Sequence, residues 1–165
     1  RRRPHAHIVV VGDDGVSYGA ALPAGQTYKQ KALSEVGAKI DMSRLHLLGR
    51  VPYDVLLRVY QVSSAHVYLT YPFVLSWSVL EAMAAGCAVV ASRTAPVEEI
   101  ISDRKDGWLV DFFSAEEIAQ RVDEVLQRTP EVTAIRAQAR RSVTSRFDLR
   151  NVCLPAHLRL VESSV

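Results

Sequence analysis

The side chains that could do chemistry gather around one carboxylate, Glu81, in the stretch from Val67 to Ser92. Two hydroxyls, those of Ser76 and Ser78, stand shortly before it. A carboxylate offers two acceptor oxygens, which suits a pair of neighbouring hydroxyls on a ligand. Ser78 and Glu81 also fit an S-x-x-E capping box, in which Glu81 would only cap the start of a helix. The spacing by itself favours the cap, so both interpretations stay open at this point.

The elements that must position Glu81 are predicted to be a strand, a tight loop, a helix and a second strand. Val67–Thr70 is β-branched and aromatic, as in a buried strand. The helix is expected to begin near Ser76 or Ser78 and to end at Gly86, and the apolar run 87–91 has the length of a strand. Such a helix aims its free N–H groups at the loop, and phosphate is the commonest anion bound in this way.

Three main-chain N–H groups in this loop, those of Leu75, Ser76 and Trp77, are predicted to form a phosphate and sugar cradle. Backbone donors at a helix N-terminus bind anions whatever the residue type. The hydroxyls of Ser76 and Ser78 could add donors or serve as caps. Trp77 is large enough to cover a sugar, and an ordinary packing role fits it at least as well.

The segment SWSVLEAMAAGCAVVAS, with TAPVEEIISDRKDGWLV after it, resembles the nucleotide-sugar-binding half of a GT-B glycosyltransferase of family 4. That family consists of retaining enzymes that use a sugar nucleotide as donor. Its motif is two glutamates with seven residues between them, and the second lies in an L-E-A-M/F-A-x-G string that residues 80–86 match. The resemblance runs from Ile8 to about Leu160. It implies that the Glu81 carboxylate accepts hydrogen bonds from the two ribose hydroxyls of the donor nucleotide.

The sequence departs from the family at the first glutamate, where it has Phe73. The family's glutamate contacts hydroxyls of the transferred sugar, and phenylalanine cannot accept those hydrogen bonds. The Gly-Phe-Gly that follows in the family is replaced here by Val74-Leu75-Ser76, which the resemblance assigns to the donor site together with Phe73. Either the donor sugar is held differently, or the choice of donor is altered, or activity is lost.

Two further loops are predicted to reach the nucleotide. The apolar run His7–Val11 predicts a buried strand, which leads into a Gly-Asp-rich loop that begins at Gly12 and resembles the family's strand end at the nucleotide crevice. The next strand, Leu45–Gly49, leads to Arg50 and Val51, which the resemblance puts near the nucleobase. The Arg50 guanidinium could stack on a base, or it could be a solvent-facing charge at a strand end.

Strands alternate with helices along the chain, which predicts a parallel, doubly wound sheet with right-handed crossovers. The expected fold class is therefore α/β, a Rossmann-like doubly wound parallel sheet that forms one half of a GT-B fold. Ligands bind such sheets at the carboxyl ends of the strands, so the loops after Val11, Leu48, Leu69 and Val90 should converge there. The other elements are expected at 26–36, 55–64, within 93–101, at 108–110, after Ser114, and as two helices after Pro130, the last near 151–161.

The chain is interpreted as one nucleotide-sugar-binding domain, residues 1–165, with 147–165 as a terminal helical segment. Because it starts on Arg1-Arg2-Arg3 without an initiator methionine, we expect it to be a fragment of a longer protein. The resemblance puts an N-terminal acceptor-binding domain and the first β-α unit, with a Lys/Arg pair, upstream of Arg1. The fragment alone is expected to be inactive, because half of the cleft would be missing.

Composition narrows the class of function. The 165 residues are 48% hydrophobic and 23% charged, as in an ordinary soluble globular protein, and a net charge of +2 gives no argument for nucleic acid. Basic residues cluster at 1–3 and in the late helices, either as a solvated face or as a contact with an anionic bilayer or a neighbouring domain. With no signal peptide or transmembrane span visible, we expect a cytoplasmic protein, at most peripheral at the inner membrane face.

Cysteine and histidine do not predict a metal or cofactor site. Cys87 and Cys153 lie far apart, without CxxC spacing, and are predicted to be buried free thiols in a reducing compartment. His5 and His7 alternate along a strand, but no third ligand is in register, so no metal and no cofactor is predicted. No Ser-His-Asp or Cys-His constellation can be recognised, and no catalytic residue is assigned.

Taken with the resemblance, these features predict the donor-binding domain of a retaining glycosyltransferase. It would bind a nucleoside-diphosphate sugar, and the longer protein would transfer the sugar to a glycan or lipid-linked acceptor, as in polysaccharide biosynthesis. One alternative is a degenerate, non-catalytic module, marked by Phe73, that binds a nucleotide or a partner. The other is a sugar-nucleotide epimerase on a similar fold, with its chemistry in the absent half.

Overall fold

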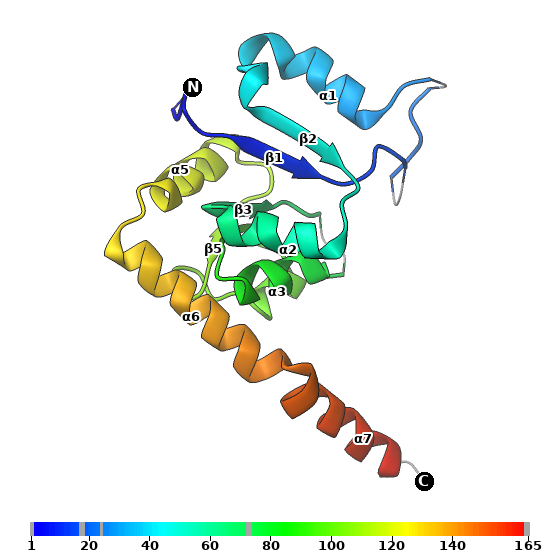
Figure 1. Ribbon diagram of the computed structural model, residues 1–165, viewed down its shortest axis with the longest axis vertical. Helices are drawn as coiled ribbons and strands as arrows, with labels where there is room; N and C mark the ends of the chain where they lie inside the picture. The colour runs from blue at the N-terminus through cyan, green and yellow to red at the C-terminus, as the bar shows by residue number, and fades with distance from the viewer. Residues whose placement is uncertain (1, 17–18, 24, 72–73, 164–165) are drawn as a thin grey trace. The chain divides into compact units, whose positions relative to one another are not determined.

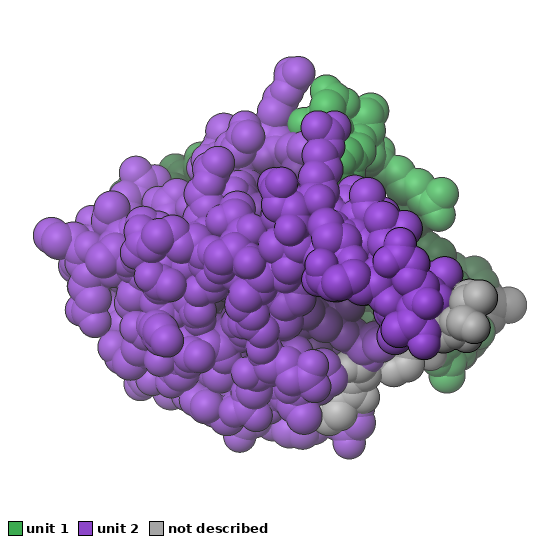
Figure 2. Space-filling model, turned by 90° about the horizontal axis from the view of Figure 1, so that it is seen from below, with its two compact units in different colours: residues 1–56 green, residues 57–165 purple. Residues whose placement is uncertain are grey.

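The computed structural model describes residues 2–16, 19–23, 25–71 and 74–163 (Figure 1). The chain divides into two compact units, Arg1–Leu56 (unit 1) and Leu57–Val165 (unit 2), coloured green and purple in Figure 2. The boundary falls within helix α2 (Tyr53–Val62). Each unit contains its own parallel sheet.

Unit 1 is a strand–helix–strand arrangement. Its strands β1 (Ile8–Val11) and β2 (Leu45–Gly49) pair in parallel. Between them lie helix α1 (Tyr28–Val36) and two short 3₁₀ turns, Gly37–Lys39 and Met42–Arg44. The bounds of β2 agree with the sequence prediction, and those of β1 and α1 agree to within two residues.

A complete capping box fixes where α1 begins. The Gln30 amide donates to the Thr27 hydroxyl (3.2 Å), and the Thr27 amide donates to the Gln30 side chain (3.0 Å). Two backbone N–H groups at the helix start are thereby satisfied. This box explains why the helix starts at Tyr28 and not at the predicted Gln26.

The strands of unit 1 are more exposed than their sequence predicts. The apolar run at 7–11 is typical of a buried strand, yet Ile8 is 52% exposed and Val10 is 47% exposed. Two leucines of β2, Leu47 and Leu48, are exposed as well. Two strands and one helix cannot cover both faces of a sheet, and α1 itself has no buried residue. The prediction of a buried strand is therefore wrong for β1.

Unit 2 contains a three-stranded parallel sheet in the order β3-β4-β5. The strands are β3 (Ala65–Tyr68), β4 (Ala88–Ser92) and β5 (Trp108–Val110). The helices are α3 (Trp77–Ala84), α4 (Ala95–Glu98), α5 (Ala115–Leu126), α6 (Pro130–Phe147) and α7 (Leu154–Glu162), with a π-helical segment, Leu149–Cys153, before α7. In Figure 1, α7 extends the line of α6 towards the C-terminus.

The core of unit 2 is built on β4, in which every residue is buried. Ala88 and Val90 belong to a cluster with β5, α5 and the start of α6 that includes Trp108 and Val125. Successive residues of a strand point to opposite faces, so Val89 faces the other side, where α3 contacts β4. Burial of a large apolar side chain stabilises a fold by roughly 1.5–3 kcal/mol. The helices on both faces therefore hold this sheet in place.

The α/β class and the parallel pairing follow the prediction, whereas the extent of the sheet and some boundaries do not. The five strands of the described residues form two hydrogen-bonded groups, not one continuous sheet. β3 ends at Tyr68, two residues before the predicted Thr70, because the main chain of Thr70 bonds to the Ser92 side chain and not to the ladder. The helix predicted within 93–101 is only the four-residue α4. β5 has the predicted bounds.

Candidate functional site

Helix α3 is capped by Ser76. The Ser76 hydroxyl oxygen accepts hydrogen bonds from the Ser78 amide (3.3 Å) and the Ser78 hydroxyl (3.0 Å). The third helical position is then Val79, so Glu81 lies beyond the position from which a glutamate closes a capping box. The capping-box interpretation of Ser78 and Glu81 is wrong, because the helix starts two residues earlier than that box requires.

Glu81 lies, partly buried, on a firmly anchored helix. Three fully buried residues hold α3 in the core of unit 2: Val79, Ala82 and Met83. At the other end of the helix, Arg136 Nε of α6 donates to the Gly86 carbonyl (2.7 Å). Gly86 has a φ of +78°, a left-handed conformation that favours glycine after a helix. The carboxylate of Glu81 therefore extends from a rigid support.

The amides at the start of α3 differ in their partners. The Ser76 N–H donates to the Tyr68 hydroxyl (3.1 Å). The N–H groups of Leu75 and Trp77 have no acceptor within the part of the chain that the structure describes. Such groups, together with the helix dipole, give a helix N-terminus its attraction for anions. Of the three predicted cradle donors, two thus have no partner among the described residues and one is already engaged.

Two side chains of the same loop are strongly exposed. Trp77 is 81% exposed and Val74 is 70% exposed. A core packing role for Trp77 is therefore wrong, and its ring is accessible to a ligand. Phe73, which stands in place of the family's first glutamate, lies outside the described residues.

In unit 1 the ends of β1 and β2 bring Gly12 and Arg50 together. The Gly12 N–H donates to the Gly49 carbonyl (2.9 Å), and Arg50 Nε lies 3.0 Å from Asp13 Oδ2. Gly12 has a φ of +143°, which favours glycine at this strand end. The Arg50 side chain is 83% exposed, and such surface ion pairs are worth little energy, so its guanidinium can change partners. Val51, the next residue, is partly buried.

The predicted site residues therefore fall into two sets. Unit 1 contains Gly12, Arg50 and Val51, and unit 2 contains Val74, Leu75, Ser76, Trp77 and Glu81. Within each unit these residues lie in loops at the carboxyl ends of parallel strands or on the helix that follows, as expected for ligand sites on such sheets.

The histidines of unit 1 form a pair that the sequence did not predict. His7 Nδ1 and His46 Nε2 are 2.8 Å apart, and the two rings are stacked with their centroids 5.1 Å apart. Arg44 lies beside this pair, 3.4 Å from His7 Nε2, and its positive charge opposes a bound cation. The described residues contain no cluster of three or more potential metal ligands.

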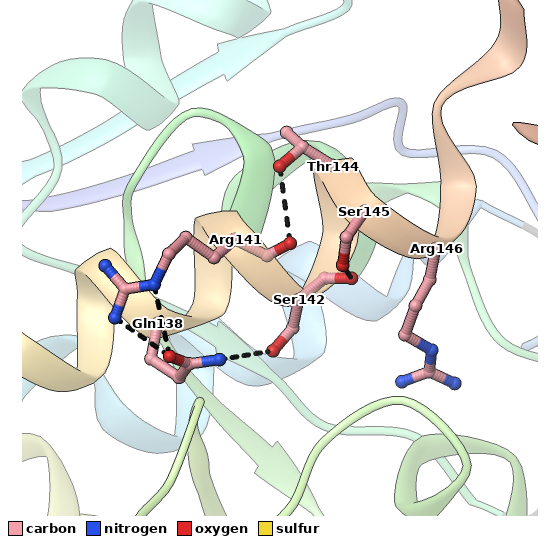
Figure 3. A pocket seen from close by; sticks show the side chains of 6 residues that line it. All are labelled: Gln138, Arg141, Ser142, Thr144, Ser145 and Arg146. Carbon is pink, nitrogen blue, oxygen red and sulfur yellow. Dashed lines mark hydrogen bonds between the residues drawn. The ribbon is translucent and has the colours of Figure 1, made fainter. Parts of the chain in front are cut away.

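The basic residues of α6 are partly structural. Arg146 donates to the Glu99 carbonyl (2.8 Å), in addition to the bond of Arg136 to Gly86. A shallow hollow of about 480 Å³ on this helix (Figure 3) is lined by Gln138, Arg141, Ser142, Thr144, Ser145 and Arg146. Its polar groups bond to one another: Arg141 donates to the Gln138 side chain (2.8 Å), and that side chain donates to Ser142 (3.2 Å). These contacts favour a role in packing over a ligand site.

Neither cysteine is in a disulfide, as predicted, but only Cys87 is buried. Burial raises the pKa of the Cys87 thiol to about 11, so this group stays protonated and unreactive. Cys153 is partly exposed, and its predicted burial is wrong. Among the helices of the described residues, none is both long enough and apolar enough to cross a membrane.

Sequence reasoning missed two hydroxyl groups that hold the loop before α3. Tyr68 bonds to Ser76, and Ser92 bonds to Thr70. Tyr68 is predicted only as a member of a strand, and Ser92 lies just beyond the predicted strand 87–91, because strand propensity says nothing about a hydroxyl that reaches a neighbouring loop. A polar residue at the end of an otherwise apolar run, as Ser92 is after Ala88–Ala91, was the available signal.

The chain matches the family of glycosyl transferases group 1 over residues 1–142. Since this match covers most of the 165 residues, the protein belongs to that family. A search of curated protein sequences found no match.

Several solved structures resemble this chain in fold. The Anabaena protein Alr3699/HepE in complex with UDP superposes with a TM-score of 0.82 at 21% identity, over 98% of this chain and 42% of that one. A glycosyltransferase from Rickettsia africae gives 0.80 at 20% identity, over 96% and 40%. The C-terminal domain of the group 1 protein LpcC from Francisella tularensis gives 0.60 at 23% identity, over 72% and 60%.

These similarities define the fold as a Rossmann-like half of a GT-B fold. The expected fold class is thereby confirmed. The chain spans about two-fifths of the length of the Anabaena and Rickettsia structures.

Proposed function

We propose that this protein binds a nucleoside-diphosphate sugar at the N-terminus of α3 and supplies the donor site of a glycosyltransferase. The observation that carries the proposal is the geometry of this helix. Ser76 caps it, Glu81 lies outside the cap, and the Leu75 and Trp77 amides have no acceptor among the described residues. Membership of glycosyl transferases group 1 supports sugar transfer as the reaction class. The complexes of Alr3699/HepE with UDP and UDP-glucose support a nucleoside diphosphate as the ligand class.

Each part of the donor has a proposed partner. The Glu81 carboxylate accepts hydrogen bonds from the two ribose hydroxyls. The Leu75 and Trp77 amides bind the diphosphate and the sugar, while the Ser76 amide is held by the Tyr68 hydroxyl; Val74 belongs to the same loop. The resemblance to family 4 alone supports the proposal that Arg50 and Val51 contact a base and that Gly12 allows the backbone to approach a nucleotide closely.

Transfer of the sugar would depend on how the donor is positioned and on how the charge of the departing diphosphate is stabilised. The departing diphosphate gains negative charge, and the helix N-terminus offsets it electrostatically. We expect no metal or resident cofactor, because N–H groups and basic side chains can meet this need. We further propose retention of configuration and a glycan or lipid-linked acceptor, bound by an N-terminal domain that this chain does not contain; both come from the resemblance to family 4. On that view, this chain alone is inactive.

A second candidate function is that of a module that binds a nucleotide without transferring a sugar. The observation that favours it is Phe73 at the position of the family's first glutamate. Phenylalanine removes the carboxylate that contacts the transferred sugar in the family. It leaves the ribose and diphosphate contacts unchanged, so nucleotide binding is expected in either case. An epimerase would alter the sugar without any acceptor, and no observed feature of the described residues favours it.

Calorimetric titration with UDP, GDP and ADP tests the proposal. The wild-type protein should bind one of them in a saturable way, and Glu81→Ala should weaken this binding at least tenfold without a matching fall in melting temperature. Glu116→Ala, an exposed carboxylate on α5, is the control and should bind like the wild type.

Two results would contradict the proposal. One is that no nucleotide binds at millimolar concentration, which would remove the donor site. The other is that Glu81→Ala lowers stability but leaves nucleotide binding unchanged, which would make Glu81 a structural residue.

We also propose that the protein acts in the cytoplasm, with peripheral contact at the inner membrane face through exposed arginines of the late helices. Arg140, Arg141 and Arg150 are exposed and could approach anionic headgroups. Sedimentation with anionic vesicles, but not with neutral ones, is expected at low salt. Equal sedimentation with both would contradict this contact.

A further inference from the structure

The loop between β3 and α3 is fastened at its first end by Ser92. This serine ends β4 and is fully buried. Its hydroxyl accepts from the Thr70 N–H (2.9 Å) and donates to the Thr70 carbonyl (2.8 Å). One side chain thus satisfies both main-chain groups of the residue at which the loop leaves the sheet.

The same loop is fastened at its other end by Tyr68. The Tyr68 hydroxyl accepts from the Ser76 N–H (3.1 Å), at the residue that caps α3. Tyr68 is the last residue of β3, and its ring lies near that of His66, with centroids 6.5 Å apart. The hydroxyl therefore extends from a fixed strand to the start of the helix.

The hydrogen bonds of Ser92 and Tyr68 hold the loop on either side of the amides that would bind the donor. Ser76 lies between Leu75 and Trp77, whose N–H groups have no acceptor among the described residues. The bond to the Tyr68 hydroxyl fixes the planar peptide unit that carries the Ser76 N–H, and the neighbouring amides can then turn only through the φ and ψ angles of Leu75 and Ser76. A loop ordered before the ligand arrives loses less entropy on binding.

We propose that Tyr68 and Ser92 are positioning residues for the donor loop, and that they hold the N-terminus of α3 in the orientation that binds a diphosphate. This inference rests on the proposed function. Neither side chain needs to touch the ligand. Both act through the main chain, Ser92 through Thr70 and Tyr68 through Ser76.

Variants that change single hydroxyls separate positioning from packing. Tyr68→Phe keeps the ring and removes the hydroxyl, and Ser92→Ala removes the hydroxyl from a buried site. Tyr71→Phe is the matched control: the same chemical change within the same loop, at a side chain that is 66% exposed.

Two measurements on each variant make the test complete. The first is hydrogen exchange of the amides at 74–78, with the amides of α6 as an internal reference. The second is calorimetric titration with UDP, GDP and ADP. We expect exchange at the loop to accelerate in Tyr68→Phe and Ser92→Ala while exchange in α6 is unchanged. The affinity for the nucleotide that the wild type binds should fall about tenfold, and Tyr71→Phe should change neither.

The outcomes distinguish this inference from the proposed function. Unchanged loop exchange in both variants, or faster exchange with unchanged affinity, would overturn the positioning role while the donor site stands. Faster exchange throughout α6 would show that the hydroxyls only stabilise the core. Failure of the wild type to bind any nucleotide would overturn the proposed function, and with it the role of the loop in donor binding.

Discussion

Units 1 and 2 contain strands of similar sequence that differ in how deeply they are buried. β1 reads IVVV and β4 reads AVVAS, both apolar and both in parallel sheets. Every residue of β4 is buried, whereas Val9 and Val10 of β1 are 41% and 47% exposed. The difference lies in what packs on each strand: α3, α5 and α6 contact β4, and α1 has no buried residue. An apolar run thus predicts a strand, but its burial depends on the elements that cover it.

The two methionines of the described residues give the largest expected contrast. Met83 in α3 is fully buried in unit 2, and Met42 is 49% exposed in unit 1. Met83→Ala should lower the free energy of unfolding by about 2–5 kcal/mol, because it leaves a cavity in the core. Met42→Ala should lower it by less than about 1 kcal/mol. Urea unfolding followed by circular dichroism measures both, and equal effects would contradict the contrast.

In unit 2, Glu124 accepts several hydrogen bonds from other side chains. In unit 1, by comparison, Arg50 forms an ion pair with Asp13 at the surface. The Glu124 carboxylate accepts from both Arg104 Nη atoms (3.0 and 3.1 Å), from Trp108 Nε1 (3.1 Å) and from Arg121 (3.0 Å). Burial alone would raise the pKa of Glu124, but hydrogen bonds from Trp108 and Arg121 and the charges of Arg104 and Arg121 bring it below its ordinary value.

The Glu124→Gln variant should therefore lose about 1–2 kcal/mol of stability at neutral pH. The folded-state pKa is depressed, so the wild-type advantage is present above the ordinary value of 4.5 and is lost as the pH falls through the folded pKa. Urea unfolding of both proteins at several pH values between neutral and acid checks this. An advantage that persisted undiminished in acid would contradict the assignment.

His66 offers a smaller, pH-dependent test of burial in unit 2. Desolvation lowers the pKa of His66 below 6.5, and its Nε2 atom is buried with no hydrogen-bond partner among the described residues. The unfolded chain then binds the proton more readily than the folded one, so stability should be full above pH 6.5 and fall as the pH drops below it. In His66→Phe, which keeps a ring beside Tyr60 and Tyr68, this pH dependence should be weaker. An identical pH profile would show that His66 is accessible to water.

Arg50→Ala should have the smallest effect on stability, less than about 1 kcal/mol, because its pair with Asp13 is exposed to solvent. Raising the salt concentration to about 1 M should remove even this difference. If Arg50 contacts the base, the same variant should nevertheless weaken nucleotide binding. A large loss of stability would mean that the pair supports the structure of unit 1.

Much of the fold could be predicted from the sequence, because local signals agreed with one another. Apolar runs bounded by turn residues located β2 and β5, and the Ser114 cap located α5, where the Glu117 amide donates to the Ser114 hydroxyl (3.2 Å). The segment Ser114-Ala115-Glu116-Glu117 also has the sequence of a capping box, but the described contacts lack the reciprocal bond, since the Glu117 side chain instead accepts from the Asp111 amide (2.9 Å).

The features that could not be predicted depend on contacts between residues far apart in the sequence. The partner of His7 is His46 on the next strand, and register between strands cannot be derived from one sequence. The choice between Ser76 and Ser78 as the cap of α3 depends on Tyr68, which fixes the Ser76 amide. The loop and the helix at the candidate site could therefore be predicted as secondary structure, whereas their role in binding stays a prediction and the role of Glu81 could not be decided by spacing.

The contact between Glu81 and the ribose is the central claim, and a double-mutant cycle tests it most directly. Titrations would compare the nucleoside diphosphate that binds best with its 2′-deoxy analogue, on the wild type and on Glu81→Ala. The wild type should bind the ribonucleotide about tenfold more tightly than the deoxy analogue, and Glu81→Ala should bind the two almost equally. If Glu81→Ala keeps the wild-type preference for the ribonucleotide, the carboxylate does not bind the ribose and the account of the donor site is wrong.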